Sequence, residues 1–142
     1  MAFELMPLVG PLPLRFGMTR AEVNALIDTM EVPSAYANSK ERRSDLIGVY
    51  PNYDAKGRLD FVDLSSRCLI LYHDEDILDM PADETVGLFA REFGPYQEVK
   101  STYRFAGPCF LLSIEDGEEG DEVRVVSVCT RDHYDRRFAE GE

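Results

Sequence analysis

The densest group of side chains able to do chemistry is His73-Asp74-Glu75-Asp76, followed closely by Asp79. Carboxylate oxygens bind hard cations such as Ca²⁺ and Mg²⁺, which makes a metal site the first reading to test. Contiguous residues cannot all point at one ion, however, and no helical H-x-x-x-H or E-x-x-H spacing occurs here. The segment therefore predicts a solvated turn before a helix. Its acids would lie favourably near the positive N-terminal end of that helix.

A second acidic run, EDGEEGDE, spans residues 115–122. If Gly120 took the place of the EF-hand glycine, the calcium loop would need an acid or amide at position 117 and a glutamate at position 126. Gly117 and Val126 stand there instead. The run therefore predicts a solvated, mobile turn between two strands. Its acids also form a candidate contact surface for basic side chains, and they are Glu115, Asp116, Glu118, Glu119, Asp121 and Glu122.

Nucleophilic catalysis finds little support in the chain. The two histidines, His73 and His133, lie outside any recognisable catalytic motif, and His133 falls in a tail that is a poor place to hold a general base rigidly. Three cysteines without C-x-x-C spacing are typical of small buried hydrophobes in a reducing compartment. We therefore expect no catalytic residue, no metal and no cofactor, and a protein that is not an enzyme.

The charge is strongly acidic, with 27 Asp and Glu against 15 Lys and Arg, and most of the excess lies after residue 45. Nucleic-acid binding needs clustered Lys and Arg, so it is disfavoured. The acidity serves either solubility or attraction to a basic partner. The apolar N-terminus is interrupted by prolines and lacks a basic start, and no apolar run reaches about 20 residues, so we expect a cytoplasmic protein that does not enter a membrane.

Two segments have the pattern of amphipathic helices. The first starts at a T-x-x-E capping box, Thr19 to Glu22, and continues with apolar residues at i, i+3, i+4 and i+7. The second begins near Pro81, a residue favoured in a first helical turn, and ends at Gly94. Their stripes place Leu26 and Phe89 in the core.

The remaining segments predict strands and loops. Two hairpins are expected, one around the turn at 54–57 and one around the acidic run. The hairpin strands cover 46–53, 59–65, 109–114 and 123–129, and further extended segments are expected at 12–16, 68–73 and, with a weaker pattern, 97–104. The polar stretch 31–45 predicts a loop. The tail after residue 130 is expected to fray.

Displaced by 62 residues, the chain resembles itself. Met18, Glu22 and Leu26 align with Met80, Glu84 and Leu88, which predicts pseudo-repeats at 12–66 and 67–130, with a tail at 131–142, in one domain spanning 1–142. Two helix-hairpin units indicate an α+β fold in which two helices pack on one face of a single antiparallel sheet. The opposite face would be open to a partner.

Two stretches carry a family resemblance: PLRFGMTRAEV at 13–23 and VYPNYDAKGRLDFV at 49–62. They resemble small bacterial immunity proteins of polymorphic or contact-delivered toxin systems. The tandem helix-plus-hairpin plan is also similar to that of beta-lactamase inhibitory protein. The same motifs would serve an outer-membrane assembly lipoprotein fold, although we find no lipoprotein signal in this sequence. The resemblance implies an inhibitor that binds a cognate toxin with a basic active site and works as a monomer or weak dimer.

Two classes of function therefore remain open. The acidic charge and the open face favour a toxin inhibitor, whereas the same fold also suits a small-molecule-binding or regulatory domain without catalytic activity. A toxin-like reading frame upstream favours the first, and a ligand-sized apolar pocket between helices and sheet favours the second. The candidate partner-binding residues are Tyr50, Tyr53, Tyr72, Asp74, Glu75, Asp76 and Asp79, together with the acids at 115–122. Each tyrosine is equally well explained as a core residue with its hydroxyl at the rim.

Overall fold

The computed structural model describes residues 2–31, 40, 43–117 and 120–138 and has the predicted α+β architecture. The helices are α1 (Arg20–Thr29), α2 (Arg43–Ile47), α3 (Ala82–Phe93) and α4 (Arg131–Arg137). The strands are β1 (Ala2–Met6), β2 (Gly10–Leu12), β3 (Val49–Tyr53), β4 (Leu59–Ser65), β5 (Leu69–Tyr72), β6 (Glu75–Asp76), β7 (Gln97–Val99), β8 (Thr102–Phe105), β9 (Phe110–Gly117) and β10 (Gly120–Cys129). Glu118, Glu119 and most of the expected loop at 31–45 lie outside the described residues.

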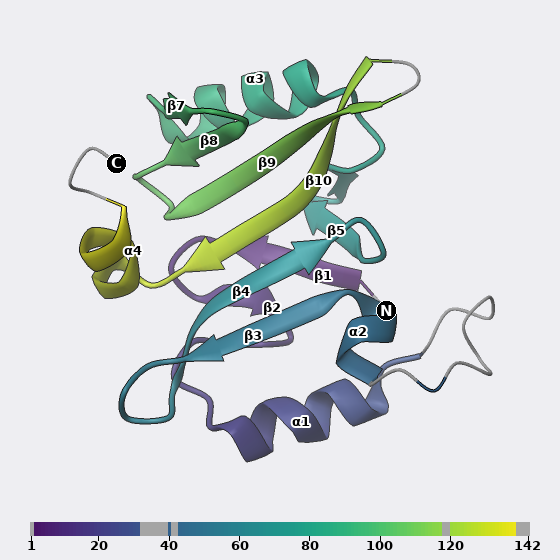
Figure 1. Ribbon diagram of the computed structural model, residues 1–142, viewed down its shortest axis with the longest axis vertical. Coiled ribbons are helices and arrows are strands. Elements are labelled where there is room, and N and C mark those ends of the chain that lie inside the picture. Colours follow the sequence, from purple (N-terminus) through teal and green to yellow (C-terminus); the bar gives the residue numbers. More distant parts are fainter. Residues whose placement is uncertain (1, 32–39, 41–42, 118–119, 139–142) are drawn as a thin grey trace.

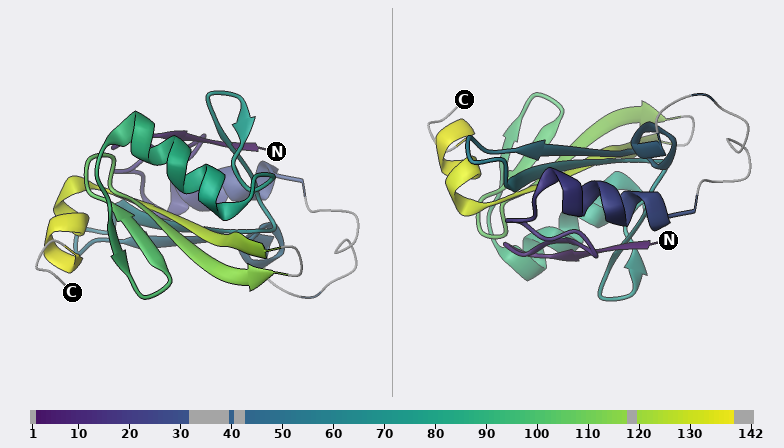
Figure 2. Two further views of the ribbon diagram at one scale, coloured as in Figure 1. Left: turned by 90° about the horizontal axis from the view of Figure 1, so that it is seen from above. Right: turned by 90° about the horizontal axis from the view of Figure 1, so that it is seen from below.

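Six antiparallel strands form the main sheet, in the order β3-β4-β10-β9-β8-β7. Both long helices, α1 and α3, lie on the same face of this sheet, and the smaller sheet lies between them (Figures 1 and 2). Alternate residues of the central strands, such as Val62, Leu112 and Val126, point into the core on that side. No described helix covers the opposite face except α4 at one end (Figure 2). We call this opposite side the open face.

The prediction of a single sheet is wrong. Strands β2, β1, β5 and β6 form a second, four-stranded sheet in which β1 and β5 run parallel, with Phe3 beside Ile70. The run at 68–73 contains strand β5, as predicted, but its partner is β1, a segment with no predicted strand. Because Phe3 and Ile70 are fully buried, this sheet closes the core between the two long helices.

Helix α1 starts as its sequence predicts. The Glu22 amide donates to the Thr19 hydroxyl at 3.2 Å, and the Thr19 amide donates to the Glu22 carboxylate at 2.9 Å, which completes the capping box. These hydrogen bonds hold the pKa of Glu22 below its ordinary value. Val23, Ile27 and Met30 are buried, whereas Leu26 is only partly buried at the edge of the core.

Helix α3 also has the predicted ends, with Pro81 at its N-cap and Gly94 at its C-cap in a positive-φ conformation (φ 91°). The Thr85 hydroxyl donates to the Ile77 carbonyl at 3.0 Å and connects the first turns of the helix to the segment that follows β6. Phe89 is 0% exposed at the centre of an aromatic cluster. The helix is therefore the main cover of the sheet half formed by β8, β9 and β10.

The first part of the tail that was expected to fray is instead the helix α4, and residues 139–142 lie outside the described residues. Thr130 caps α4 by accepting a hydrogen bond from the His133 amide at 3.1 Å. Tyr134 is buried against Cys109, Leu111 and Cys129 on the open side of the sheet. Packing against these side chains stabilises a helix of only seven residues, which its own backbone could not do. All three cysteines are buried and free, as predicted.

Candidate functional site

The β9–β10 hairpin divides its acids between two faces, because successive side chains of a strand point in opposite directions. Glu115 pairs with Glu122 on the side shared by Ser113, which is the open face. Arg124 contacts both carboxylates, Glu115 at 3.4 Å and Glu122 at 3.2 Å. Since these groups are largely solvent-exposed, the ion pairs reduce the local negative charge without adding much stability.

Asp116 and Asp121 form the other cross-strand pair, on the side that faces α3. Like charges placed directly opposite repel, and the contact with Asp116 raises the pKa of Asp121 above its ordinary value. Asp83, in the first turn of α3, adds to the same negative potential. Cations are therefore favoured at this end of the sheet.

Asp79 also reaches this region. Together with Asp121 and Glu122 it lines a hollow of about 390 Å³ beside the start of α3. Acids from two segments that lie about 40 residues apart in the sequence thus line one hollow, although on the α3 side of the sheet and not beside the open-face tyrosine. We call this group the acidic end, and it consists of Asp79, Asp83, Asp116, Asp121 and Glu122.

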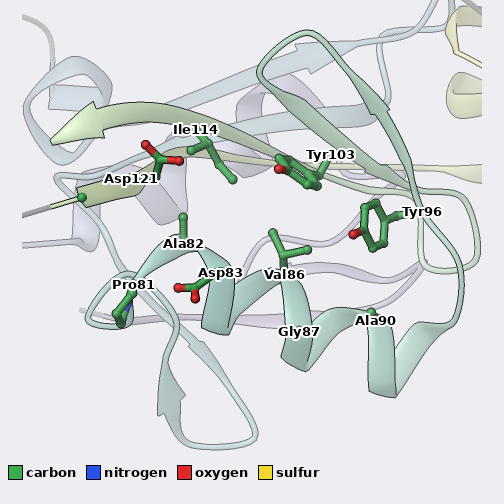
Figure 3. Close-up of a pocket in the computed structure, with 11 residues that line it drawn as sticks. Pro81, Ala82, Asp83, Val86, Gly87, Ala90, Tyr96, Tyr103, Ile114 and Asp121 are labelled. Atoms are coloured by element: carbon green, nitrogen blue, oxygen red, sulfur yellow. The ribbon is translucent and has the colours of Figure 1, made fainter.

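A groove runs between α3 and strands β8 and β9, with a volume of about 470 Å³ (Figure 3). We call it the α3 groove. Tyr96 and Tyr103 stand at one end, and the carboxylates of Asp83 and Asp121 face its other end (Figure 3). Its wall is otherwise apolar or small and is made by Pro81, Ala82, Val86, Gly87, Ala90, Ile114 and Gly120. Burial raises the pKa of Tyr103, helped by the negative charges of Glu98 and Asp121, so this phenol stays neutral.

Gly87 keeps this groove open at a cost in helix stability. It lies in the interior of α3 without a positive φ, and a Cβ there would meet only the Arg91 Nη1 atom, at 3.5 Å. A glycine inside a helix is about 1 kcal/mol less favourable than alanine. Neither backbone conformation nor crowding requires glycine at this position, and the helix surface is bare there.

The other predicted acids lie elsewhere. Asp74 occupies the turn between β5 and β6, in a positive-φ conformation that asparagine and aspartate tolerate. This hairpin projects on the helix-covered side of the main sheet, away from the open face (Figure 2). Glu75 and Asp76 belong to β6, and Asp76 accepts a hydrogen bond from the Leu78 amide at 3.1 Å. These residues shape a turn and do not join the open-face tyrosine.

The three predicted tyrosines have three different environments. Tyr50 is 41% exposed and stands opposite Asp63 on the open face, as the interface prediction requires. Tyr53 faces the helices, where the Arg20 guanidinium lies 4.3 Å from its ring centroid. Tyr72 is only 7% exposed and its hydroxyl bonds Glu92 at 3.2 Å, so it is a core residue and not an exposed contact residue.

His133 is held far more rigidly than a tail residue would be, and this corrects the expectation that the tail cannot position a base. It is 8% exposed, and its Nδ1 atom lies 3.1 Å from a carboxylate oxygen of Asp60, itself 5% exposed. Phe61 packs on the imidazole with ring centroids 4.7 Å apart. The Nε2 atom is buried without a hydrogen-bond partner among the described residues. The imidazole therefore stabilises the packing of α4 and does not present a free base to solvent.

Asp63 offers a test of electrostatics on the open face. Burial raises its pKa, while a hydrogen bond from the Ser127 hydroxyl opposes that effect. The folded state therefore binds this proton more readily than the unfolded state, so the carboxylate lowers stability at neutral pH and this loss disappears as the pH falls through the folded-state pKa.

We expect Asp63→Asn to raise the free energy of unfolding at pH 7, because the amide oxygen can still accept the Ser127 hydrogen bond without a buried charge. The gain should shrink between pH 7 and pH 4 in urea-denaturation curves. A loss of stability that is equal at both pH values would show that the charged hydrogen bond outweighs the cost of burial.

Within the described ranges, no three His, Cys, Asp or Glu side chains gather closely enough to hold a metal ion. The described helices include none with the length and apolarity needed to cross a membrane. No protein-family model matches the chain, and neither a curated protein nor a solved structure matches it.

Proposed function

We propose that this protein is an immunity protein, a stoichiometric inhibitor that binds a cognate bacterial toxin and blocks its active site or substrate surface. It acts in the cytoplasm, as a monomer or weak dimer, without catalytic activity of its own. The resemblance at 13–23 and 49–62 supports this proposal. So does the 62-residue repeat, whose aligned pairs Met18/Met80 and Leu26/Leu88 all pack against one core.

The observation that carries the proposal is the convergence of acids at the acidic end. Asp79 precedes α3 and Asp83 lies in its first turn, whereas Asp121 and Glu122 come from β10, and these residues line adjoining hollows. The exposed Tyr50 and the polar open face lie on the other side of the same sheet. A basic partner would thus meet the clustered carboxylates on the helix side of the sheet, and Glu122 connects them to the open face.

Carboxylates suit this role for a physical reason. A nuclease or a nucleotide-using enzyme holds phosphate groups with basic side chains, and a carboxylate can occupy the same positions. The net charge of −12 also attracts a basic partner over a distance, which raises the rate of encounter. The proposed toxin is therefore basic around its active site.

Co-expression tests the proposal. The polypeptide encoded immediately upstream should arrest bacterial growth when it is expressed alone, and this chain should restore growth and form a 1:1 complex with it. Because inhibition is stoichiometric, protection should require at least one inhibitor per toxin molecule. A polypeptide that is harmless, or that stays toxic and unbound in the presence of excess inhibitor, would contradict the proposal.

A histidine variant separates binding from catalysis. His73 lies in the β5–β6 turn with a positive φ that asparagine tolerates, so His73→Asn should fold and still protect cells. Circular dichroism would establish the folded state. Loss of protection in a folded His73→Asn variant would point to a chemical role for the imidazole and would be the most damaging result for a non-catalytic inhibitor.

One observation favours the second candidate function, a small-molecule-binding or regulatory domain. The α3 groove is the pocket between helix and sheet that would distinguish the two hypotheses, and its volume of about 470 Å³ falls within the usual range for small-molecule sites. The two candidate functions share residues, because Asp83 and Asp121 of the acidic end also line the groove.

A further inference from the structure

We propose that the α3 groove binds a small organic cation, a free primary amine or guanidine attached to a short hydrocarbon portion. This inference rests on the second candidate function, because it names the class of ligand that such a domain would take. Three features of the groove define the class: its apolar wall, its aromatic end and its acidic end.

The apolar wall calls for a hydrocarbon portion in the ligand. The apolar residues Val86, Ala90 and Ile114 are spread along the groove, and Gly87 adds no side chain to the helix between Val86 and Ala90 (Figure 3). Displacing water from such a surface favours binding of an apolar group of matching length. A small, fully hydrated ion would leave this part of the groove without a partner.

The aromatic end favours a positive charge or a flat apolar group. The rings of Tyr96 and Tyr103 have centroids 5.4 Å apart and are tilted by 44°, and Tyr96 also contacts Phe105 at 5.2 Å. Tyr96 is 44% exposed, so its ring is available to a ligand that enters from solvent. Aromatic faces attract ammonium and guanidinium groups through their negative potential.

The opposite end decides the sign of the ligand's charge. Asp83 and Asp121 face the groove from α3 and from β10, with Asp116 paired to Asp121. None of the lining residues is basic, and Arg91, whose Nη1 atom lies near Gly87, is not among them. An ammonium group placed here would relieve the repulsion between these carboxylates, whereas an anionic ligand would increase it.

Three probes of equal chain length test the proposal on the purified full-length protein: hexylamine, hexanol and hexanoate. Binding is followed by the backbone amide shifts of α3, β8 and β10 in NMR spectra at low ionic strength. We expect hexylamine to bind about tenfold more tightly than hexanol, and hexanoate to bind weakest, because charge alone distinguishes the three ligands.

Substitutions locate the site. Gly87→Leu should abolish the hexylamine shifts by filling the groove, whereas Gly87→Ala, its matched control, should retain them. Asp83→Asn combined with Asp121→Asn should weaken hexylamine binding about tenfold and leave hexanol unaffected. Asp74→Asn removes an acid outside the groove, in a turn that accepts asparagine, and should change neither affinity.

The outcomes separate this inference from the functions on which it depends. Equal or tighter binding of hexanol or hexanoate in the groove would contradict a cationic ligand but would still support a small-molecule-binding domain. No binding of any probe would overturn both. Tighter binding of an acetyl-Gly-Lys-Gly-amide peptide than of hexylamine would assign the cation to a protein partner and would overturn the proposal of a free ligand.

Discussion

Phe89→Ala should lower the free energy of unfolding by about 3–5 kcal/mol, the usual cost of removing a buried aromatic ring. The ring is 0% exposed and makes edge-to-face contacts with Phe93 and Phe105, with centroids 5.3 and 5.6 Å apart. It also contacts Tyr72 and Phe110, which come from the two different sheets. Its loss would leave a cavity where α3 meets both of them.

Urea denaturation of purified variants measures this effect. Leu26→Ala is a useful comparison, because Leu26 occupies the corresponding stripe of α1 but is only partly buried, and its loss should cost clearly less, about 1–2 kcal/mol. A loss below about 1 kcal/mol for Phe89→Ala would show that the ring does not occupy the centre of the core.

Neutralising part of the acidic end should slow association with the toxin about tenfold at low ionic strength. The variant Asp121→Asn with Glu122→Gln removes two exposed charges from the start of β10, where the proposed partner approaches. Long-range attraction acts mainly on the association rate, and less on the dissociation rate, so stopped-flow binding is the appropriate measurement. The rate should also become less sensitive to salt.

A matched variant controls for net charge. Asp28→Asn with Glu31→Gln also removes two exposed acids, but from the end of α1, at the far end of the molecule from the β9–β10 turn (Figure 1). It should reduce the rate much less. Salt provides a second control, because the Debye length falls from about 10 Å at 0.1 M to about 3 Å at 1 M.

Two results would contradict the electrostatic argument. Wild-type association rates that are unchanged between low salt and about 0.5 M salt would show that attraction plays no part. A complex in which the β9–β10 turn points to solvent would show that the acidic end is misplaced as the contact surface, while an inhibitor role could still hold through the open face.

Local elements could be predicted from the sequence because their signals lie within a few residues of one another. The capping box of Thr19 and Glu22 and the glycine stop at Gly94 act through neighbouring backbone groups, and the structure confirms both. The hairpin turn at Asp54 is of the same kind, since its side chain accepts hydrogen bonds from the Lys56 and Arg58 amides. In each case the partners are adjacent in the chain.

Pairings between distant segments could not be predicted in this way. The alignment of β1 with β5 joins residues almost 70 positions apart, and nothing in the segment 2–6 names its partner. Helix α4 has a capping threonine, but its stability depends on the buried contact of His133 with Asp60, 73 residues earlier. Short helices form only when such tertiary contacts offset the entropy of ordering them.

The candidate site can be divided in the same way, into features that the sequence determined and features that only the tertiary structure decided. The sequence by itself determined that the chain is acidic and that carboxylates cluster at 74–79 and 115–122. It also predicted that the second cluster lies in the turn of a β-hairpin. Only the tertiary structure decided that Asp79 and Asp121 meet while Asp74 points elsewhere, and that Tyr96 and Tyr103 line a groove that Gly87 leaves open. The physical reason is that a residue's type and spacing set its chemistry and local conformation, whereas its neighbours in space depend on how distant strands and helices bury their apolar faces together.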